Sequence, residues 1–124
     1  MAIGMIQQYQ FGSIIINGKE YHNDVEIRWD GQVLDWWRKQ SHIIDLEDIE
    51  RALGQKPELI IIGTGAYGAA KITEMAKQEI EKQGVELIID KTEEAVKTFN
   101  IIKEHSKEEQ GKEKKIIGLF HLTC

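Results

Sequence analysis

The sequence predicts an α/β domain in which a mixed β-sheet is covered by helices and preceded by an antiparallel β meander. The apolar run at residues 59–62 shows no alternation of polar and apolar residues, as in a strand that is buried on both faces. Two amphipathic helical patterns and two further apolar runs follow it, in the order β-α-β-α-β. Short runs separated by turn dipeptides come before it.

Length and charge limit what the chain can be. Its 124 residues are expected to form a single domain, 1–124, and 41% hydrophobic residues are enough for a core. The net charge of −5 argues against binding to nucleic acid or to an anionic membrane, because both require clustered Lys and Arg. The abundance of Ile, Lys and Glu is typical of a thermophile.

Cysteine usage and hydropathy predict a cytoplasmic protein. Cys124 is the sole cysteine, so the chain forms no internal disulfide, and we expect no metal site and no cofactor. Residues 1–4 do not resemble the start of a signal peptide, and no apolar run reaches the length of about 20 residues that a membrane span needs.

The first third of the chain is expected to form the meander. Asn17-Gly18, which tolerates positive φ, predicts a hairpin between Ser13–Ile16 and Lys19–Tyr21. Apolar and charged residues alternate over 25–29, which predicts a half-solvated strand, and a turn at Asp30-Gly31 leads to a return strand at 33–37.

Helix signals follow the meander. Asp45 is predicted to cap a helix over 46–53 that Gly54 ends, and a second helix is predicted to follow Gly68 directly and run to Gly84. Residues 85–89 are expected to form a second buried strand, and Thr92 is expected to cap the next helix. The charged run at 103–115 is interpreted as a solvated helix end and loop before a last strand at 116–124, whose direction the spacing leaves open.

Gly63, Gly65 and Gly68 match the dinucleotide-binding pattern G-x-G-x-x-G, and Asp90 ends the next predicted strand. A dinucleotide-binding domain normally starts with this unit, whereas here a meander precedes it. We therefore interpret the glycines mainly as a tight turn. Free N–H groups at the start of the following helix predict weak binding of a small anion at residues 65–68.

Trp36, Trp37 and Arg38, with His42 close behind, concentrate aromatic, cationic and titratable side chains. Trp and Arg are enriched in binding hot spots, so this segment is a candidate protein-binding surface. In the structural alternative, one Trp lies in the core, the other covers the sheet edge, and Arg38 stacks on it.

No catalytic constellation is predicted. His121 and Cys124 are separated by an odd offset, which places them on opposite faces of a strand and opposes a nucleophile–base pair. Buried packing is the expected role of both. The four histidines have no metal-ligand spacing, and no serine lies in a nucleophile elbow.

Four segments in this order suggest a family: Trp37-Arg38 with His42, residues 59–65, residues 92–100, and G-L-F-H-L-T-C at 118–124. They resemble a small family of unknown function founded on a methanogen hypothetical protein. That family includes the human adipogenesis-associated cytoplasmic protein and a mitochondrial assembly factor for respiratory complex I. The resemblance implies a three-layer α/β fold whose last strand runs antiparallel to the others. It implies no catalytic residue.

From these observations we predict that the chain is a non-enzymatic, assembly-type protein. It is expected to bind an unidentified protein partner through Trp36, Trp37 and Arg38. The alternative is a small-molecule or anion-binding protein, or an enzyme, that uses the turn from Gly63 to Gly68 together with His42 or Asp90. An open surface beside Trp36 and Trp37 would favour a protein partner, and a closed concavity would favour a ligand.

Overall fold

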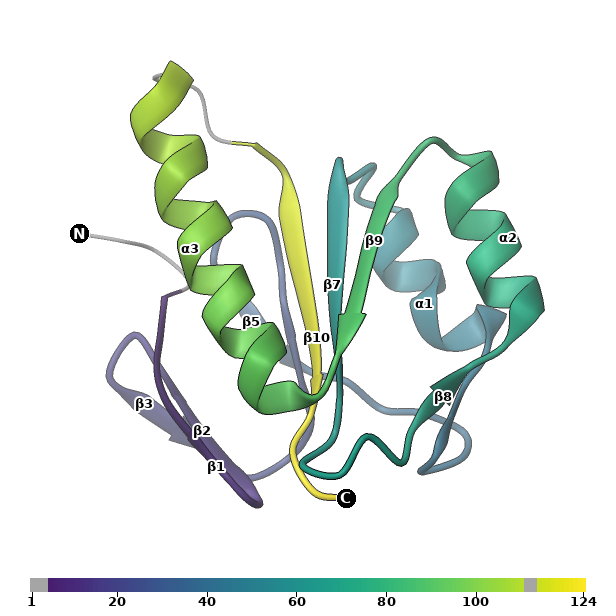
Figure 1. The fold of residues 1–124 in the computed structure, drawn as a ribbon, viewed down its shortest axis with the longest axis horizontal. Coiled ribbons are helices and arrows are strands. Elements are labelled where there is room, and N and C mark those ends of the chain that lie inside the picture. Colours follow the sequence, from purple (N-terminus) through teal and green to yellow (C-terminus); the bar gives the residue numbers. More distant parts are fainter. Residues whose placement is uncertain (1–4, 111–113) are drawn as a thin grey trace.

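The computed structural model of the protein describes residues 5–110 and 114–124 (Figure 1). Residues 1–4, which were not expected to start a signal peptide, lie outside the described residues. Residues 111–113 of the charged run also lie outside them. In chain order the elements are β1 (Ile6–Gln10), β2 (Ser13–Ile16), β3 (Lys19–Tyr21), β4 (Val25–Ile27), β5 (Val33–Asp35), β6 (Ile43–Ile44), α1 (Leu46–Leu53), β7 (Leu59–Thr64), β8 (Lys71–Ile72), α2 (Glu74–Lys82), β9 (Glu86–Asp90), α3 (Thr92–Gln110) and β10 (Ile116–His121).

The central sheet is mixed and has the strand order β5-β4-β10-β7-β9. β10 lies in its middle, parallel to β7 over six residue pairs and antiparallel to β4, while β9 runs parallel to β7. The strands β1, β2 and β3 form a separate antiparallel sheet, and β6 pairs with β8. The predicted α/β class and the N-terminal meander are confirmed, although the β4–β5 hairpin belongs to the central sheet.

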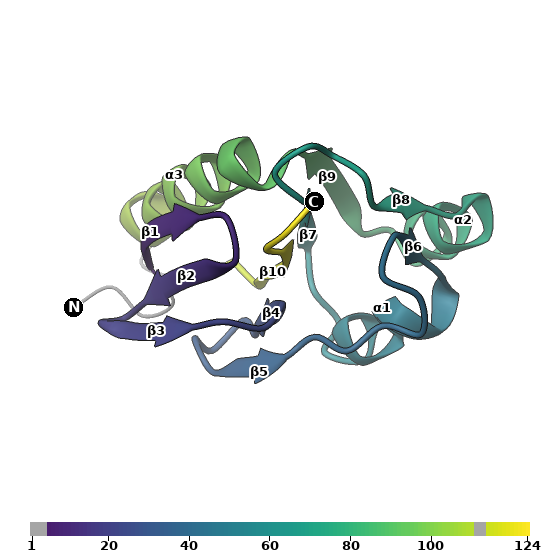
Figure 2. The same cartoon turned by 90° about the horizontal axis from the view of Figure 1, so that it is seen from below.

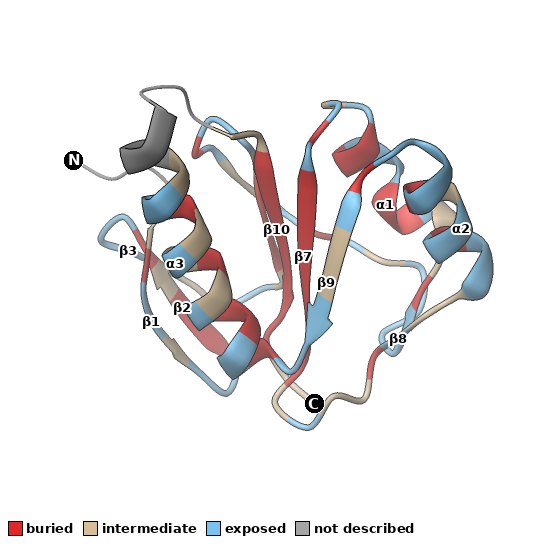
Figure 3. Cartoon of the chain, turned by 45° about the horizontal axis from the view of Figure 1, so that its top comes forward, coloured by how far each residue is buried: buried red, intermediate tan, exposed pale blue. Residues whose placement is uncertain are grey.

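Two apolar cores, one on each face of the central sheet, make the fold three-layered. Leu59 and Ile61 face a core shared with α3 and the small sheet, whereas Ile60 and Ile62 face a core shared with α1 and α2. Successive residues of a strand point to opposite faces, so each face of β7 needs its own apolar cover. β7 and β10 are accordingly buried along their whole length (Figure 3).

Local signals place several elements as predicted. Asn17 and Gly18 have φ of 52° and 83°, as their hairpin turn requires. Asp45 caps α1 in a capping box with Asp48. Gly54 follows the last residue of α1, as expected.

Three expectations about strands are wrong. The last strand is not antiparallel to all the others, because β10 pairs in parallel with β7 and is antiparallel to β4 alone of its two neighbours. β9 is an edge strand and only partly buried. In β4 the side chain of Glu26 is 1% exposed instead of solvated, since its carboxylate accepts hydrogen bonds of 2.8 Å from Arg51 Nε and Gln55 Nε2.

The glycine turn does not open a helix. After β7 the chain runs through a loop and the short strand β8, and α2 begins only at Glu74 with Thr73 as its N-cap. Thr92 is the first residue of α3, and its hydroxyl makes contacts outside that helix. The helix predicted to start directly after Gly68 is therefore wrong, as is the capping role of Thr92.

Within 5–110 and 114–124, no helix combines the length and the apolar character that crossing a bilayer requires.

The fold predicts which glycine is intolerant of a side chain. A Cβ at Gly118 would lie 3.0 Å from the Phe99 ring and closer still to the ring of Phe120, both in the core. We expect Gly118→Ala to lower the free energy of unfolding by about 1–3 kcal/mol through overpacking, measured by urea denaturation.

Gly54→Ala is the matched control, because Gly54 has φ of −63° and its Cβ would make ordinary contacts of 3.4 Å and more. It is expected to leave stability unchanged or raise it slightly. Equal losses in the two variants would contradict this account of the core.

Candidate functional site

Polar side chains gather where the strands of the central sheet end. β5, β10, β7 and β9 run in one direction, so their carboxyl ends share one edge, and β4 starts there because it is antiparallel to β10. Figure 2 views this edge and shows the C-terminus near its middle. We call it the carboxyl edge; in α/β sheets it is the usual location of binding sites.

Asp24, Arg38 and His121 form a charged cluster at this edge. His121 Nδ1 lies 2.7 Å from Asp24 Oδ2, and Arg38 Nη1 lies 2.8 Å from the same oxygen. Asp24 Oδ1 accepts a hydrogen bond of 2.7 Å from the backbone N–H of Leu122. The Arg38 and His121 side chains are 4% and 2% exposed, so the cluster ties three distant segments together inside the protein.

The cluster favours the ionised form of Asp24. Burial alone would raise the pKa of this carboxyl group. The hydrogen bonds from His121 and from the Leu122 N–H, with the charges of Arg38 and His121, outweigh burial and hold the pKa below its ordinary value. Asp24 is therefore an anion at neutral pH.

The position of the His121 proton follows from its neighbours. Nδ1 also lies 3.0 Å from Arg38 Nη2, which can only donate. The shorter contact is with the carboxylate, so we assign the proton to Nδ1, while Arg38 Nη2 donates to the Ser41 carbonyl oxygen at 2.8 Å. In the neutral ring this leaves the Nε2 lone pair 3.5 Å from Thr123 Oγ1.

The Arg38 guanidinium keeps unused N–H groups. It stacks over the Trp36 ring at 4.5 Å, which anchors its position. Neither Nε nor Nη1 donates a hydrogen bond to any residue in 5–110 or 114–124. The ion pair with Asp24 thus balances the charge of Nη1 without providing an aligned hydrogen bond.

His42 and Cys124 lie next to this cluster. Cys124 Sγ is 3.5 Å from His42 Nε2, and the His42 ring packs edge-on against His121 with centroids 5.9 Å apart. His121 is buried as expected, but Cys124 is only half-buried, so its predicted buried packing is wrong. The chain leaves β10 after His121, so strand geometry no longer fixes Cys124, and its histidine neighbour comes from residue 42.

Backbone N–H groups of the glycine turn already donate hydrogen bonds within the protein. The N–H of Gly65 donates to Thr92 Oγ1, and those of Ala66 and Ala69 donate to the carbonyl oxygens of Thr123 and Cys124. A Cβ at Gly65, which has φ of +107°, would lie 2.5 Å from the Cys124 backbone. This turn packs against the chain end and lacks the helix start on which the predicted anion site rested.

The remaining predicted site residues are spread over core and surface. Trp36 is buried and donates from Nε1 to the Asp48 carbonyl oxygen at 2.9 Å, whereas Trp37 is 78% exposed. Trp36, Trp37 and Arg38 therefore do not form one exposed surface. Gly63 is buried against Thr92 and Phe120, and Asp90 is exposed at the end of β9.

Sequence reasoning missed Asp24 and, for Thr92, predicted a helix cap instead of its contacts with Gly65 and His121. Asp24 precedes a strand in an unremarkable turn, and only the pairing of β4 with β10 brings it to His121. Thr92 Oγ1 donates to the His121 carbonyl oxygen at 2.6 Å and accepts from the Gly65 N–H at 2.8 Å. No local pattern indicates either contact.

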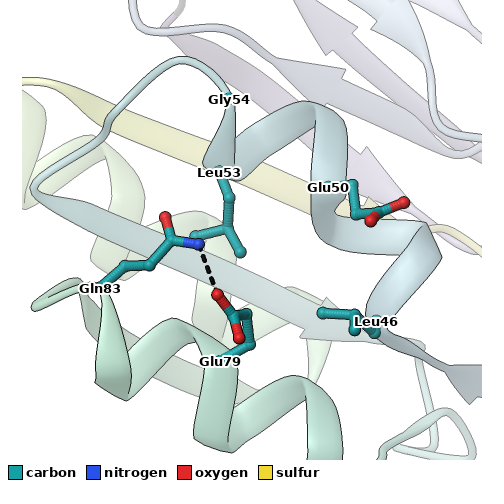
Figure 4. Close-up of a pocket in the computed structure, with 6 residues that line it drawn as sticks. All are labelled: Leu46, Glu50, Leu53, Gly54, Glu79 and Gln83. Carbon is teal, nitrogen blue, oxygen red and sulfur yellow. Dashed lines mark hydrogen bonds between the residues drawn. The ribbon is translucent and has the colours of Figure 1, made fainter.

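A hollow of about 450 Å³ lies elsewhere, between α1 and α2 (Figure 4). It is lined by Leu46, Glu50, Leu53, Gly54, Glu79 and Gln83, and Gln83 Nε2 donates to Glu79 Oε2 at 2.7 Å. None of the predicted site residues lines it. In the described part of the chain, no three His, Cys, Asp or Glu side chains are arranged to hold a metal ion.

The Asp24 cluster predicts a pH-dependent contribution to stability. Because the pKa of folded Asp24 is depressed, its contribution is complete above the ordinary pKa and is lost as pH falls through the folded value. Asp24→Asn leaves Arg38 without its counter-charge, so it is expected to cost about 3 kcal/mol at pH 7.

Urea unfolding from pH 7 downwards tests this expectation, since the difference between the two proteins should shrink as the wild-type carboxyl group becomes protonated. Asp35→Asn, at an exposed position, is the control and should track the wild type throughout. A difference that stays constant with pH would refute the linkage.

Thr92 gives a second prediction. Thr92→Val keeps the shape but leaves the His121 carbonyl oxygen and the Gly65 N–H without this partner, so we expect a loss of about 2 kcal/mol in unfolding free energy. Thr92→Ser retains the hydroxyl and should recover most of that loss. If the two variants were equally unstable in thermal unfolding, the hydroxyl would have no such role.

Comparison with known proteins supports the resemblance. A conserved hypothetical protein, PH1505 from Pyrococcus horikoshii OT3, has the same fold with a TM-score of 0.79 at 28% identity, over 96% of this chain and 98% of the other. The structure named MT938 matches with a TM-score of 0.75 at 28% identity, over 97% and 98%. A protein from Bordetella pertussis, described as a Mth938-like domain, matches with a TM-score of 0.69 at 16% identity, over 98% and 87%, which shows the fold alone.

The family is shown by a sequence profile described as "Protein of unknown function (DUF498/DUF598)", which matches residues 6–109. This range includes Asp24, Arg38 and the glycine turn, and ends before β10. The chain therefore belongs to the DUF498/DUF598 family, as its resemblance to a family founded on a methanogen protein had indicated.

Proposed function

We propose that this protein acts in the cytoplasm, without catalysis of its own, by binding another protein at the carboxyl edge. The observation that carries the proposal is the exposure of three aromatic side chains there: Phe11 is 57% exposed, Tyr67 is 73% exposed and Trp37 is 78% exposed. Exposed large apolar side chains that gather at one place mark interaction sites on proteins.

Three different segments present these side chains around the chain end. The N–H of Gly12, next to Phe11, donates to the Leu122 carbonyl oxygen at 2.9 Å. The N–H of Ala66, next to Tyr67, donates to the carbonyl oxygen of Thr123. Phe11 and Tyr67 are in ring contact with centroids 6.1 Å apart, so two of the three segments meet directly.

Trp37 is held by its neighbours on both sides. Trp36 is anchored in the core through Asp48, and Arg38 through Asp24 and the Ser41 carbonyl oxygen. A side chain whose backbone is fixed before binding loses less conformational entropy on association. Trp36 and Arg38 thus serve the proposed surface as positioning residues, and Trp37 is the group that touches the partner.

The partner is inferred to be a protein that presents apolar side chains, because none of the three aromatic groups carries a charge. Aromatic residues dominate the energetics of protein interfaces. The family that the sequence resembles includes a mitochondrial assembly factor, which acts through protein partners, and this agrees with the proposed mode of action. The alternative of an anion bound at the glycine turn has less support, since the N–H groups of Gly65, Ala66 and Ala69 are engaged.

Aromatic substitutions at the carboxyl edge test the proposal. We expect Trp37→Ala and Tyr67→Ala each to weaken partner binding by about 2 kcal/mol, or roughly 30-fold in Kd. Both side chains are exposed, so the unfolding free energy should change by less than about 0.5 kcal/mol. Affinity capture from native cells with quantitative mass spectrometry identifies the partner, and calorimetry with that partner gives Kd.

Ile101→Ala is the matched control, because Ile101 is an apolar side chain on α3 that is 61% exposed and does not belong to the group of Phe11, Trp37 and Tyr67. Its capture profile and Kd should equal those of the wild type. If the double variant Trp37→Ala/Tyr67→Ala retained its partners as well as Ile101→Ala does, the carboxyl edge would not be the binding surface.

A further inference from the structure

The thiol of Cys124 has a base within reach and an opening to solvent. Its Sγ lies 3.5 Å from His42 Nε2, a hydrogen-bonding distance for sulfur. His42 is exposed and Cys124 is half-buried, so a small molecule can approach the sulfur. A thiol within hydrogen-bond reach of an imidazole is the arrangement that activates cysteine as a nucleophile.

Both members of the pair are held in place. The carbonyl oxygen of His42 accepts a hydrogen bond of 2.9 Å from the N–H of Lys71, at the β6–β8 pairing. The His42 ring packs edge-on against the buried ring of His121. On the other side, the Cys124 carbonyl oxygen accepts from the N–H of Ala69 at 2.9 Å. The short distance between thiol and imidazole is therefore built by three segments.

A buried cation contacts two neighbours of His42. The Arg38 guanidinium contacts His121 Nδ1 and the carbonyl oxygen of Ser41, the residue before His42. Its side chain is 4% exposed, and its Nε and Nη1 donate no hydrogen bond to the described residues. Arg38 also offsets the charge of Asp24.

We propose that Cys124 and His42 form a thiol-modification site that takes a low-molecular-weight disulfide. His42 Nε2 accepts the proton of the Cys124 thiol, and the thiolate attacks one sulfur of the disulfide. A new S–S bond joins Cys124 to that half, and the old S–S bond breaks. The other half leaves as a thiolate, which takes up the proton from His42. The disulfide is the oxidant and is reduced to one thiol.

This inference is independent of the protein-binding proposal. It rests on the contact between Cys124 and His42, whereas the binding proposal rests on the exposed side chains of Phe11, Trp37 and Tyr67. Modification of Cys124 consumes one disulfide per chain, so it requires no catalytic turnover.

Glutathione disulfide is the probe, and the mixed disulfide is followed by intact-protein mass spectrometry at pH 7. The wild type should gain one glutathione per chain, and Cys124→Ser should gain none. A free cysteine is only a few per cent thiolate at this pH. In His42→Gln the thiol loses its proton acceptor, so the second-order rate constant for its reaction with glutathione disulfide should fall about tenfold. His42 is exposed, so the variant should unfold like the wild type, and His42→Asn provides a second substitution.

His22→Gln is the matched control, because the His22 side chain is 69% exposed and its ionic contact is with Glu20. It should react at the wild-type rate. The proposal is overturned if His42→Gln and His42→Asn react as fast as the wild type, or if the wild type forms no adduct.

Discussion

The pairing of β10 with β7 is the constraint on which the rest of the structure depends. Six residue pairs join residues 59–64 to residues 116–121, and both strands are buried on both faces. Neither strand can be covered by one layer alone, so α3 with the small sheet covers one face, and α1 with α2 covers the other. Because β10 is central, it also carries His121 and the following residues into the middle of the molecule.

The carboxyl edge gains its character from this central position. The last residues of the chain pass between the β1–β2 turn and the loop after β7, which hold them by backbone hydrogen bonds. Asp24 and Arg38 then close the cluster around His121 from the β4–β5 side. Burial makes each of these polar groups costly unless it is paired, so the cluster fixes the edge in one arrangement. Exposed aromatic groups and a half-buried thiol are displayed on that rigid base.

The glycine-rich turn shows how a sequence motif can mislead. In a dinucleotide-binding fold, such glycines allow a phosphate to approach the start of a helix. Here the same freedom lets the protein's own C-terminal residues approach, and the side chain of Thr92 supplies the hydroxyl that receives the Gly65 N–H. The pattern identified a close approach of backbone correctly, but the approaching group lies some sixty residues further along the chain and is invisible to local spacing.

Local physics in the sequence was sufficient for the α/β class, for the buried strand at 59–62, and for the Asn17-Gly18 turn and the Asp45 cap, because each depends on neighbouring residues alone. Tertiary structure alone decided the direction and central place of β10, the burial of Glu26 and Trp36, and the late start of α2. It also brought Asp24, Arg38 and His121 together, and His42 to Cys124. These contacts join residues up to 97 positions apart, and their formation depends on strand order, which no periodicity encodes.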